Sequence, residues 1–170
     1  GQYLCFALRR WKGFEEKAPI FGAAAEYAYR TYGLTPVFVA VEKHLDPGAG
    51  QLAARGLTIP HYFLNDAGSA GTIIGALSRM QAVVSMRLHA LIFAAGQGIP
   101  LAGVVYDPKV SAFLRYIGQD LFVDLADLTE TDLRSMIDQC VAQAAHPETQ
   151  EAAVRTLQAM EHKNVEVARR

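Results

Sequence analysis

Three side chains that could bind or protonate an anion, Arg87, His89 and Lys109, follow two short apolar runs in the middle of the chain. Arg87 and His89 come directly after residues 83–86, and Lys109 comes shortly after residues 101–106. If both runs are strands of a parallel sheet, their carboxyl ends meet at the edge where ligands bind. The helices that follow begin there with free N–H groups, which favour anions. These residues therefore predict a site for a small anion that carries phosphate or carboxylate.

The residues around these three side chains predict the elements that hold them. Apolar residues recur at helical spacing over 88–95, and the glycines and proline within 96–100 end that helix. Asp107 and Pro108 are the residue types of an N-cap and a first helical position. Each candidate cation is therefore expected in a turn that joins a strand to a helix.

The same alternation of strand and helix runs through the whole chain. Six strands are predicted, over 3–8, 36–41, 59–64, 83–86, 101–106 and 121–125. Helices are predicted over 15–32, 46–54, 69–80, 88–95, 107–117, 129–145 and 153–165. This pattern is typical of an α/β fold with a doubly wound parallel sheet, Rossmann-like, with strand order 3-2-1-4-5-6. We expect a single domain over 1–170, with its core in 3–125 and its C-terminal helices in 129–170.

The expected strand order brings further cations to the same edge. Arg9 and Arg10 follow the first strand, and the topological switch falls between the first and fourth strands. The two arginines would then lie beside Arg87 and His89, while Lys109 follows the neighbouring fifth strand. Basic residues from distant parts of the chain are therefore expected to converge on one crevice.

Composition excludes several classes of function. The 170 residues are 51% apolar and 19% charged, and the formal net charge is −1. This balance argues against a nucleic-acid partner. The most apolar window, 88–106, is interrupted by polar residues, glycines and a proline, which argues against an integral membrane segment. Cys5 and Cys140 form no CxxC pair, so we expect buried free thiols and a reducing compartment.

Several familiar motifs are missing from the sequence. No GxGxxG follows the first strand, which argues against a dinucleotide, and no GxSxG marks a hydrolase. The five histidines lack metal-ligand spacing, so neither a metal nor another cofactor is expected. Gly68, Gly71 and Gly75 favour close helix packing over phosphate contact. Glu42 and Asp66 are interpreted as solvated loop acids, with binding of sugar hydroxyls as the alternative.

A longer ordered motif in the centre of the chain resembles the polysaccharide pyruvyl transferase family. The residues that carry the resemblance are Ser85-Met86-Arg87-Leu88-His89-Ala90-Leu91-Ile92, Gly98-Ile99-Pro100, Tyr106-Asp107-Pro108-Lys109-Val110 and Phe113. Within the family, the chain is most similar to the CsaB-type branch, which pyruvylates secondary cell wall polymers that anchor S-layer proteins. The resemblance extends over most of residues 3–125 and is sharp only in the centre.

The resemblance implies an activity and a set of site residues. It implies transfer of pyruvate from phosphoenolpyruvate, the donor substrate, to a sugar of a lipid-linked saccharide, forming a ketal in the cytoplasm or at the inner membrane face. It assigns donor contacts to His89, Lys109 and Arg87, which we interpret as the catalytic residues. His89 suits proton transfer, or serves only as a phosphate ligand, and the cations suit charge stabilisation. Arg9, Arg10, Asp107 and Ser85 are the further substrate-binding candidates.

The resemblance also implies a larger protein. The family has a two-domain glycosyltransferase-B-like fold, of which this chain would be the C-terminal half, and the chain starts directly in a strand-like run. Its own N-terminal domain is then a partner, and the isolated chain is expected to be inactive. The alternatives are a glycosyltransferase domain that binds a nucleotide sugar and a non-catalytic module that binds a sugar polymer.

Overall fold

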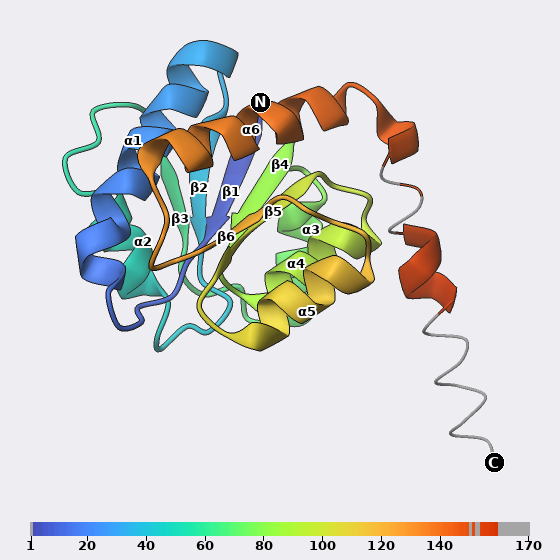
Figure 1. Cartoon of the computed structure of the whole chain (residues 1–170). Coiled ribbons are helices and arrows are strands. Elements are labelled where there is room, and N and C mark those ends of the chain that lie inside the picture. Colours follow the sequence, from blue (N-terminus) through green and yellow to red (C-terminus); the bar gives the residue numbers. More distant parts are fainter. Residues whose placement is uncertain (1, 150, 152–153, 160–170) are drawn as a thin grey trace.

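The computed structural model describes residues 2–149, 151 and 154–159, which form a parallel sheet with helices on both faces (Figure 1). The strands are β1 (Tyr3–Ala7), β2 (Thr35–Val39), β3 (Tyr62–Leu64), β4 (Ala82–Ser85), β5 (Leu101–Val105) and β6 (Phe122–Asp124). Every neighbouring pair is parallel, in the order β3-β2-β1-β4-β5-β6. The predicted fold class and strand order are both confirmed.

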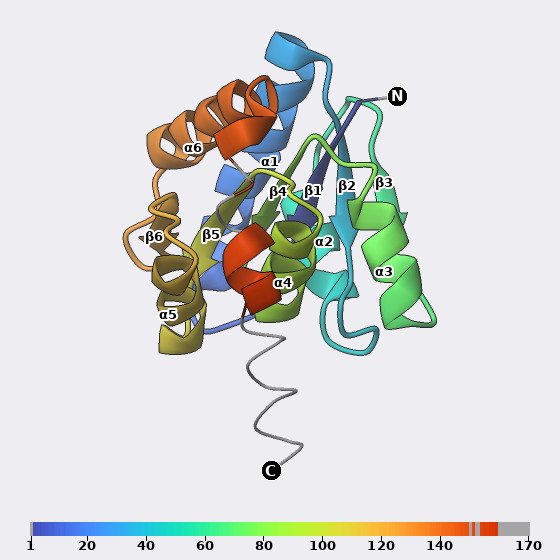
Figure 2. The same cartoon turned by 90° about the vertical axis from the view of Figure 1, so that its right-hand side faces the viewer.

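Helices cover both faces of the sheet. They are α1 (Phe14–Tyr32), α2 (Pro47–Ala53), α3 (Ala70–Leu77), α4 (Leu88–Gly96), α5 (Pro108–Tyr116) and α6 (Glu130–Ala144), followed by the short 3-10 helix η1 (Pro147–Thr149). Figures 1 and 2 show α1, α2 and α6 on one side of the sheet and α3, α4 and α5 on the other. All loops that leave the carboxyl ends of the strands therefore lie at one edge, the lower one in Figure 1.

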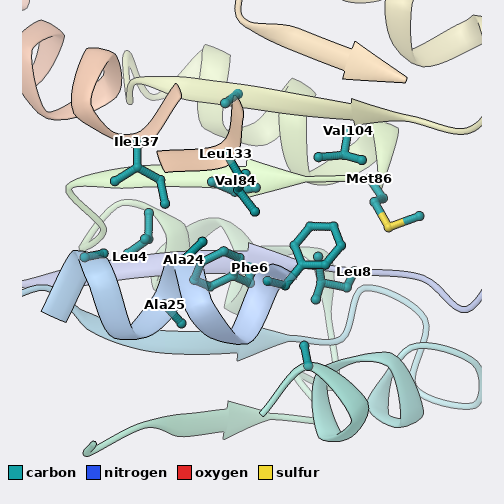
Figure 3. Packing of buried hydrophobic residues seen from close by; sticks show 14 of the residues in the cluster. Leu4, Phe6, Leu8, Ala24, Ala25, Val84, Met86, Val104, Leu133 and Ile137 are labelled. Carbon is teal, nitrogen blue, oxygen red and sulfur yellow. The ribbon is translucent and has the colours of Figure 1, made fainter. Parts of the chain in front are cut away.

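Two apolar clusters, one on each face, hold the layers together. Under α1, α2 and α6, alternate residues of the strands pack with the helices, as Phe6, Val84 and Ile137 do in Figure 3. The strand residues that point to the other face of the sheet, such as Cys5 and Val83, pack in the same way against α3, α4 and α5. The four inner strands β2, β1, β4 and β5 are buried on both faces, whereas the edge strands β3 and β6 are partly exposed. The inner strands therefore appear in the sequence as continuous apolar runs.

The helix termini follow the expected local chemistry. Thr129 and Asp132 form the predicted capping box of α6, and Ser69 accepts a hydrogen bond from the Thr72 N–H at the start of α3. Gly33 ends α1 with φ of 69°, a left-handed conformation that glycine adopts without steric cost. Cys5 and Cys140 are buried free thiols, as predicted.

Some predicted segments differ from the observed ones. The predicted strand 59–64 shortens to Tyr62–Leu64, after Pro60, which has no N–H for the sheet.

The predicted close packing at Gly71 and Gly75 is wrong: a Cβ at Gly75 would meet nothing within 4 Å, and one at Gly71 would meet only the Ser69 hydroxyl. Of the predicted helix 153–165, residues 154–159 are helical, whereas 153 and 160–165 lie outside the described residues. No helix in the described ranges is long and apolar enough to cross a membrane.

Candidate functional site

A cavity of about 610 Å³ opens at the carboxyl edge of the sheet, where the loops after β2, β3 and β4 meet. Its polar lining includes Glu42, Lys43, His44, Asp66, Ser69, Arg87 and His89. Two of the three residues that the sequence favours for chemistry, Arg87 and His89, thus share one cavity. We call it the Arg87 cavity.

Arg87 is fixed at its backbone by Ser85. The Ser85 hydroxyl accepts a hydrogen bond from the Arg87 N–H (2.8 Å) and lies 2.9 Å from the Arg87 carbonyl oxygen and 3.3 Å from that of Ala7. Ser85 is fully buried. We predicted substrate contact for Ser85, whereas in this structure its polar contacts are all internal, and they hold the turn of Arg87 against the end of β1.

The side chain of Arg87 is held by an acid that sequence reasoning missed. Nε of Arg87 lies 3.3 Å from Oδ2 of Asp46, and the exposed fractions of the two side chains are 13% and 0%. The same oxygen accepts hydrogen bonds from the N–H groups of Val41 (3.1 Å) and Glu42 (2.8 Å). The sequence presents Asp46 only as a helix cap before Pro47, but its side chain makes no cap hydrogen bond and turns back toward the loop.

The electrostatic state of Asp46 reflects opposing influences. Burial raises the pKa of its carboxyl, and the two loop N–H groups together with the charges of Arg87 and Arg9 act in the opposite direction. The net direction is upward. Arg9 therefore lies close enough to Asp46 for its charge to be felt at the same carboxylate that holds Arg87.

His89 is exposed on the first turn of α4, with its ring centroid 6.3 Å from that of Phe93. It borders the Arg87 cavity and does not enter the core. An exposed imidazole at the start of a helix is accessible to an anion.

The two arginines after β1 point to different places. Nη1 of Arg9 donates to the Tyr106 hydroxyl (3.4 Å), and the guanidinium carbon lies 5.3 Å from the centre of the Trp11 ring. Arg10 pairs with Glu15, and its side chain lies close to Gly48. Neither arginine lines the Arg87 cavity. The expected convergence of both on one crevice is therefore not seen here.

Lys109 and Asp107 begin α5 at the same edge of the sheet. Oδ1 of Asp107 accepts from the Lys109 N–H (2.9 Å), which confirms the predicted cap. The Lys109 side chain is exposed and forms no ion pair with any residue that the structure describes. Since β4 and β5 are neighbours, Lys109 starts from the strand next to that of His89, but it does not line the Arg87 cavity.

A second cavity, of about 700 Å³, lies at the same edge near β1, β5 and β6. Its lining includes Trp11, Tyr106, Asp107, Asp124 and Asp127, together with Lys12, Glu16, Lys17 and Ser111. The Trp11 and Tyr106 rings lie 5.0 Å apart between centres, and Trp11 is 48% exposed. We call it the Trp11 cavity. The sequence signal that could have revealed it is a tryptophan directly after the first strand.

No group of three or more His, Cys, Asp or Glu side chains within the described ranges is arranged to hold a metal ion.

Comparison with known proteins identifies a family whose sequence profile matches the chain and several solved structures that share its fold. The sequence profile of the family described as "Polysaccharide pyruvyl transferase" matches residues 3–108. No protein of curated function matches the chain.

Several solved structures share the fold. The glycotransferase of kitacinnamycin superposes with a TM-score of 0.64 at 15% identity, covering 92% of this chain and 39% of that one. The UDP-GlcNAc 2-epimerase from Neisseria meningitidis gives 0.59 at 13% identity, with 97% and 44% covered. A trehalose-phosphate synthase from Burkholderia vietnamiensis gives 0.61 at 14%, with 94% and 42% covered. This chain thus spans less than half of each relative, and the likeness shows a Rossmann-like fold of the glycosyltransferase-B type.

Proposed function

Because the chain belongs to the polysaccharide pyruvyl transferase family, we propose that it supplies the donor site for transfer of a pyruvyl group from phosphoenolpyruvate to a sugar. The family assignment supports a transferase that modifies polysaccharides. The donor, the sugar and the individual steps given below are our proposal.

The observation that carries this proposal is the pairing of Arg87 and His89 in one cavity at the start of α4. Phosphoenolpyruvate carries a phosphate and a carboxylate, so it needs cations and N–H donors at close range. Arg87 and His89 offer both a guanidinium and an imidazole there. Lys109 begins the neighbouring helix α5 and is exposed, so its long side chain is available to the same ligand.

The chemistry that the site must support is ketal formation. One sugar hydroxyl adds to C2 of the donor while C3 takes up a proton and becomes a methyl group. The bond from C2 to the phosphate oxygen then breaks, the second hydroxyl closes the ketal, and its proton leaves with the phosphate. His89 would move a proton, since imidazole titrates near neutral pH, and Arg87 and Lys109 would stabilise the departing phosphate.

The Trp11 cavity suits the acceptor better than the donor. Asp107, Asp124 and Asp127 would repel phosphoenolpyruvate, whereas carboxylates accept hydrogen bonds from sugar hydroxyls. The exposed indole of Trp11 offers an apolar face to the C–H side of a sugar ring. We propose that a lipid-linked saccharide lies there, that the protein acts at the cytoplasmic side of a membrane, and that a second domain completes the site.

The competing function is transfer from a nucleotide sugar, and one observation favours it: Glu42 and Asp66, both able to accept ribose hydroxyls, line the Arg87 cavity. Calorimetric titration of the chain with phosphoenolpyruvate, and separately with a uridine diphosphate sugar, distinguishes the two. We expect binding of phosphoenolpyruvate that weakens in Arg87→Ala. Binding of the nucleotide sugar alone would refute the proposal. A module that only binds polymer would take up neither small molecule.

A further inference from the structure

Oδ1 of Asp46 is the one buried side-chain oxygen or nitrogen in the described part of the chain that has no hydrogen-bond partner. Oδ2 accepts hydrogen bonds from two loop N–H groups and forms an ion pair with Nε of Arg87, whereas Oδ1 accepts nothing. A buried carboxylate with an unpartnered oxygen is costly, and an apolar residue would pack there at less cost. Its presence therefore points to a purpose other than stability.

The contact with Asp46 fixes how Arg87 presents its charge. A guanidinium is a planar fork, and an ion pair whose closest approach is at Nε leaves both terminal nitrogens available. No described residue accepts from Nη1 or Nη2 of Arg87, and neither atom is buried. Because Arg87 lines the cavity, its free edge is suited to a bidentate contact with phosphate or carboxylate.

The same carboxylate also shapes the wall of the cavity. Its bonds to the Val41 and Glu42 N–H groups hold the loop that leads from β2 to α2. Glu42, Lys43 and His44 of this loop line the cavity together with Arg87. Asp46 thus contacts both the loop that forms one wall of the cavity and Arg87, the cation that lines it.

We propose that Asp46 is a positioning residue, which orients the Arg87 guanidinium and the 41–46 loop so that an incoming dianion meets a preformed site. The proposal rests on the proposed function in so far as the dianion is phosphoenolpyruvate. Asp46 touches no reacting atom and acts through Arg87.

Two explanations of Asp46, an effect of its charge alone and a positioning role, predict opposite changes in anion affinity when its charge is removed. If Asp46 acted only through its field, Asp46→Asn would remove a negative charge near the anion and tighten its binding. If Asp46 positions Arg87, the same change weakens binding, because the amide still accepts from the loop N–H groups but no longer holds the guanidinium as an ion pair. Asp120→Asn is the matched control: Asp120 is exposed just before β6 and lines neither the Arg87 cavity nor the Trp11 cavity.

The test measures dissociation constants of phosphoenolpyruvate and inorganic phosphate by calorimetry, in the wild type, Asp46→Asn, Asp120→Asn, Arg87→Ala and the Asp46→Asn/Arg87→Ala double variant. We expect about tenfold weaker binding in Asp46→Asn, the loss typical of one charge-assisted contact. Asp120→Asn should bind both anions with unchanged affinity. In the Arg87→Ala background, Asp46→Asn should cause no further loss. Unchanged or tighter binding in Asp46→Asn would overturn the inference.

A second measurement needs no ligand and separates this inference from the proposed function. The side-chain Nε–H of Arg87 should give a slowly exchanging NMR signal in the wild type, lost in Asp46→Asn while the Val41 and Glu42 amides stay protected. Fast exchange of this group in the wild type would refute the positioning role, even if no variant folds. A slowly exchanging signal in a chain that binds neither anion would refute the donor site and leave the link between Asp46 and Arg87 standing.

Discussion

Arg9, which follows β1, hydrogen-bonds to Tyr106, which follows β5, although β4 lies between the two strands. The Arg9 side chain therefore crosses the end of β4 close to the turn that carries Arg87. On one side it contacts the aromatic rings of the Trp11 cavity. On the other, its charge partly offsets the rise that burial causes in the pKa of Asp46. Arg9 thus connects the end of β1 to the end of β5 at this edge of the sheet.

Removing the proposed proton carrier or the neighbouring lysine should abolish turnover without unfolding the protein. We expect His89→Ala and Lys109→Ala, in the native gene product that carries this chain, to lose about 100-fold or more in ketal formation. Both side chains are exposed, so the thermal midpoint should not change. Phosphate release in the presence of acceptor is the measurement.

Arg79→Ala is the control for these two variants, since it removes an exposed cation just before the amino end of β4, away from both cavities. Wild-type turnover in His89→Ala or in Lys109→Ala would remove that residue from the mechanism.

Loss of the exposed indole should weaken acceptor binding and spare donor binding. For Trp11→Ala we expect about three- to tenfold weaker binding of the saccharide, the contribution of one aromatic contact, with an unchanged dissociation constant for phosphoenolpyruvate. Tyr116→Ala is the matched control, since this ring is 56% exposed at the far end of α5. Equal loss of donor affinity would show that the two cavities act as one site.

Two glycine substitutions should change stability in opposite directions. A Cβ at Gly22 would lie 2.5 Å from the carbonyl oxygen of Ala53, so Gly22→Ala must push α1 away from α2. We expect it to reduce the free energy of unfolding by about 1–3 kcal/mol. A Cβ at Gly75 has open space, so Gly75→Ala should raise the free energy by about 0.5–1 kcal/mol through helix propensity. Urea unfolding of both variants checks this, and a stable Gly22→Ala would contradict the close contact between the helices.

The buried thiols should make the chain lose stability in alkali. Burial raises the pKa of Cys140 from 9.0 to about 12, and burial also raises the pKa of Cys5. Above pH 9 the unfolded chain therefore gives up protons that the folded chain retains, so the free energy of unfolding falls as the pH rises from 9 to 12.

Urea unfolding at several pH values measures this slope, and Cys140→Ala should flatten it while lowering stability at neutral pH. Native thiols should also resist a disulfide reagent at pH 8 and react once the chain is unfolded in urea. Rapid reaction of the folded protein would contradict burial of both cysteines.

The sequence by itself determined the architecture. Apolar runs, helical spacing between them and the caps at Thr129 and Asp107 are local patterns, and they indicate the fold class. The order β3-β2-β1-β4-β5-β6 was then expected because it is the usual one for that fold class. That order placed Arg87, His89 and Lys109 at one edge, because parallel strands with helical crossovers bring their carboxyl ends together.

Only the tertiary structure decided what each side chain contacts. Asp46 has the local appearance of a helix cap, yet its carboxylate is buried against Arg87, a residue 41 positions later in the chain. Arg9 and Arg10 are adjacent in sequence, yet one reaches Tyr106 and the other pairs with Glu15. Side-chain direction and burial depend on packing between elements that are distant in sequence, and neither periodicity nor residue type encodes them locally.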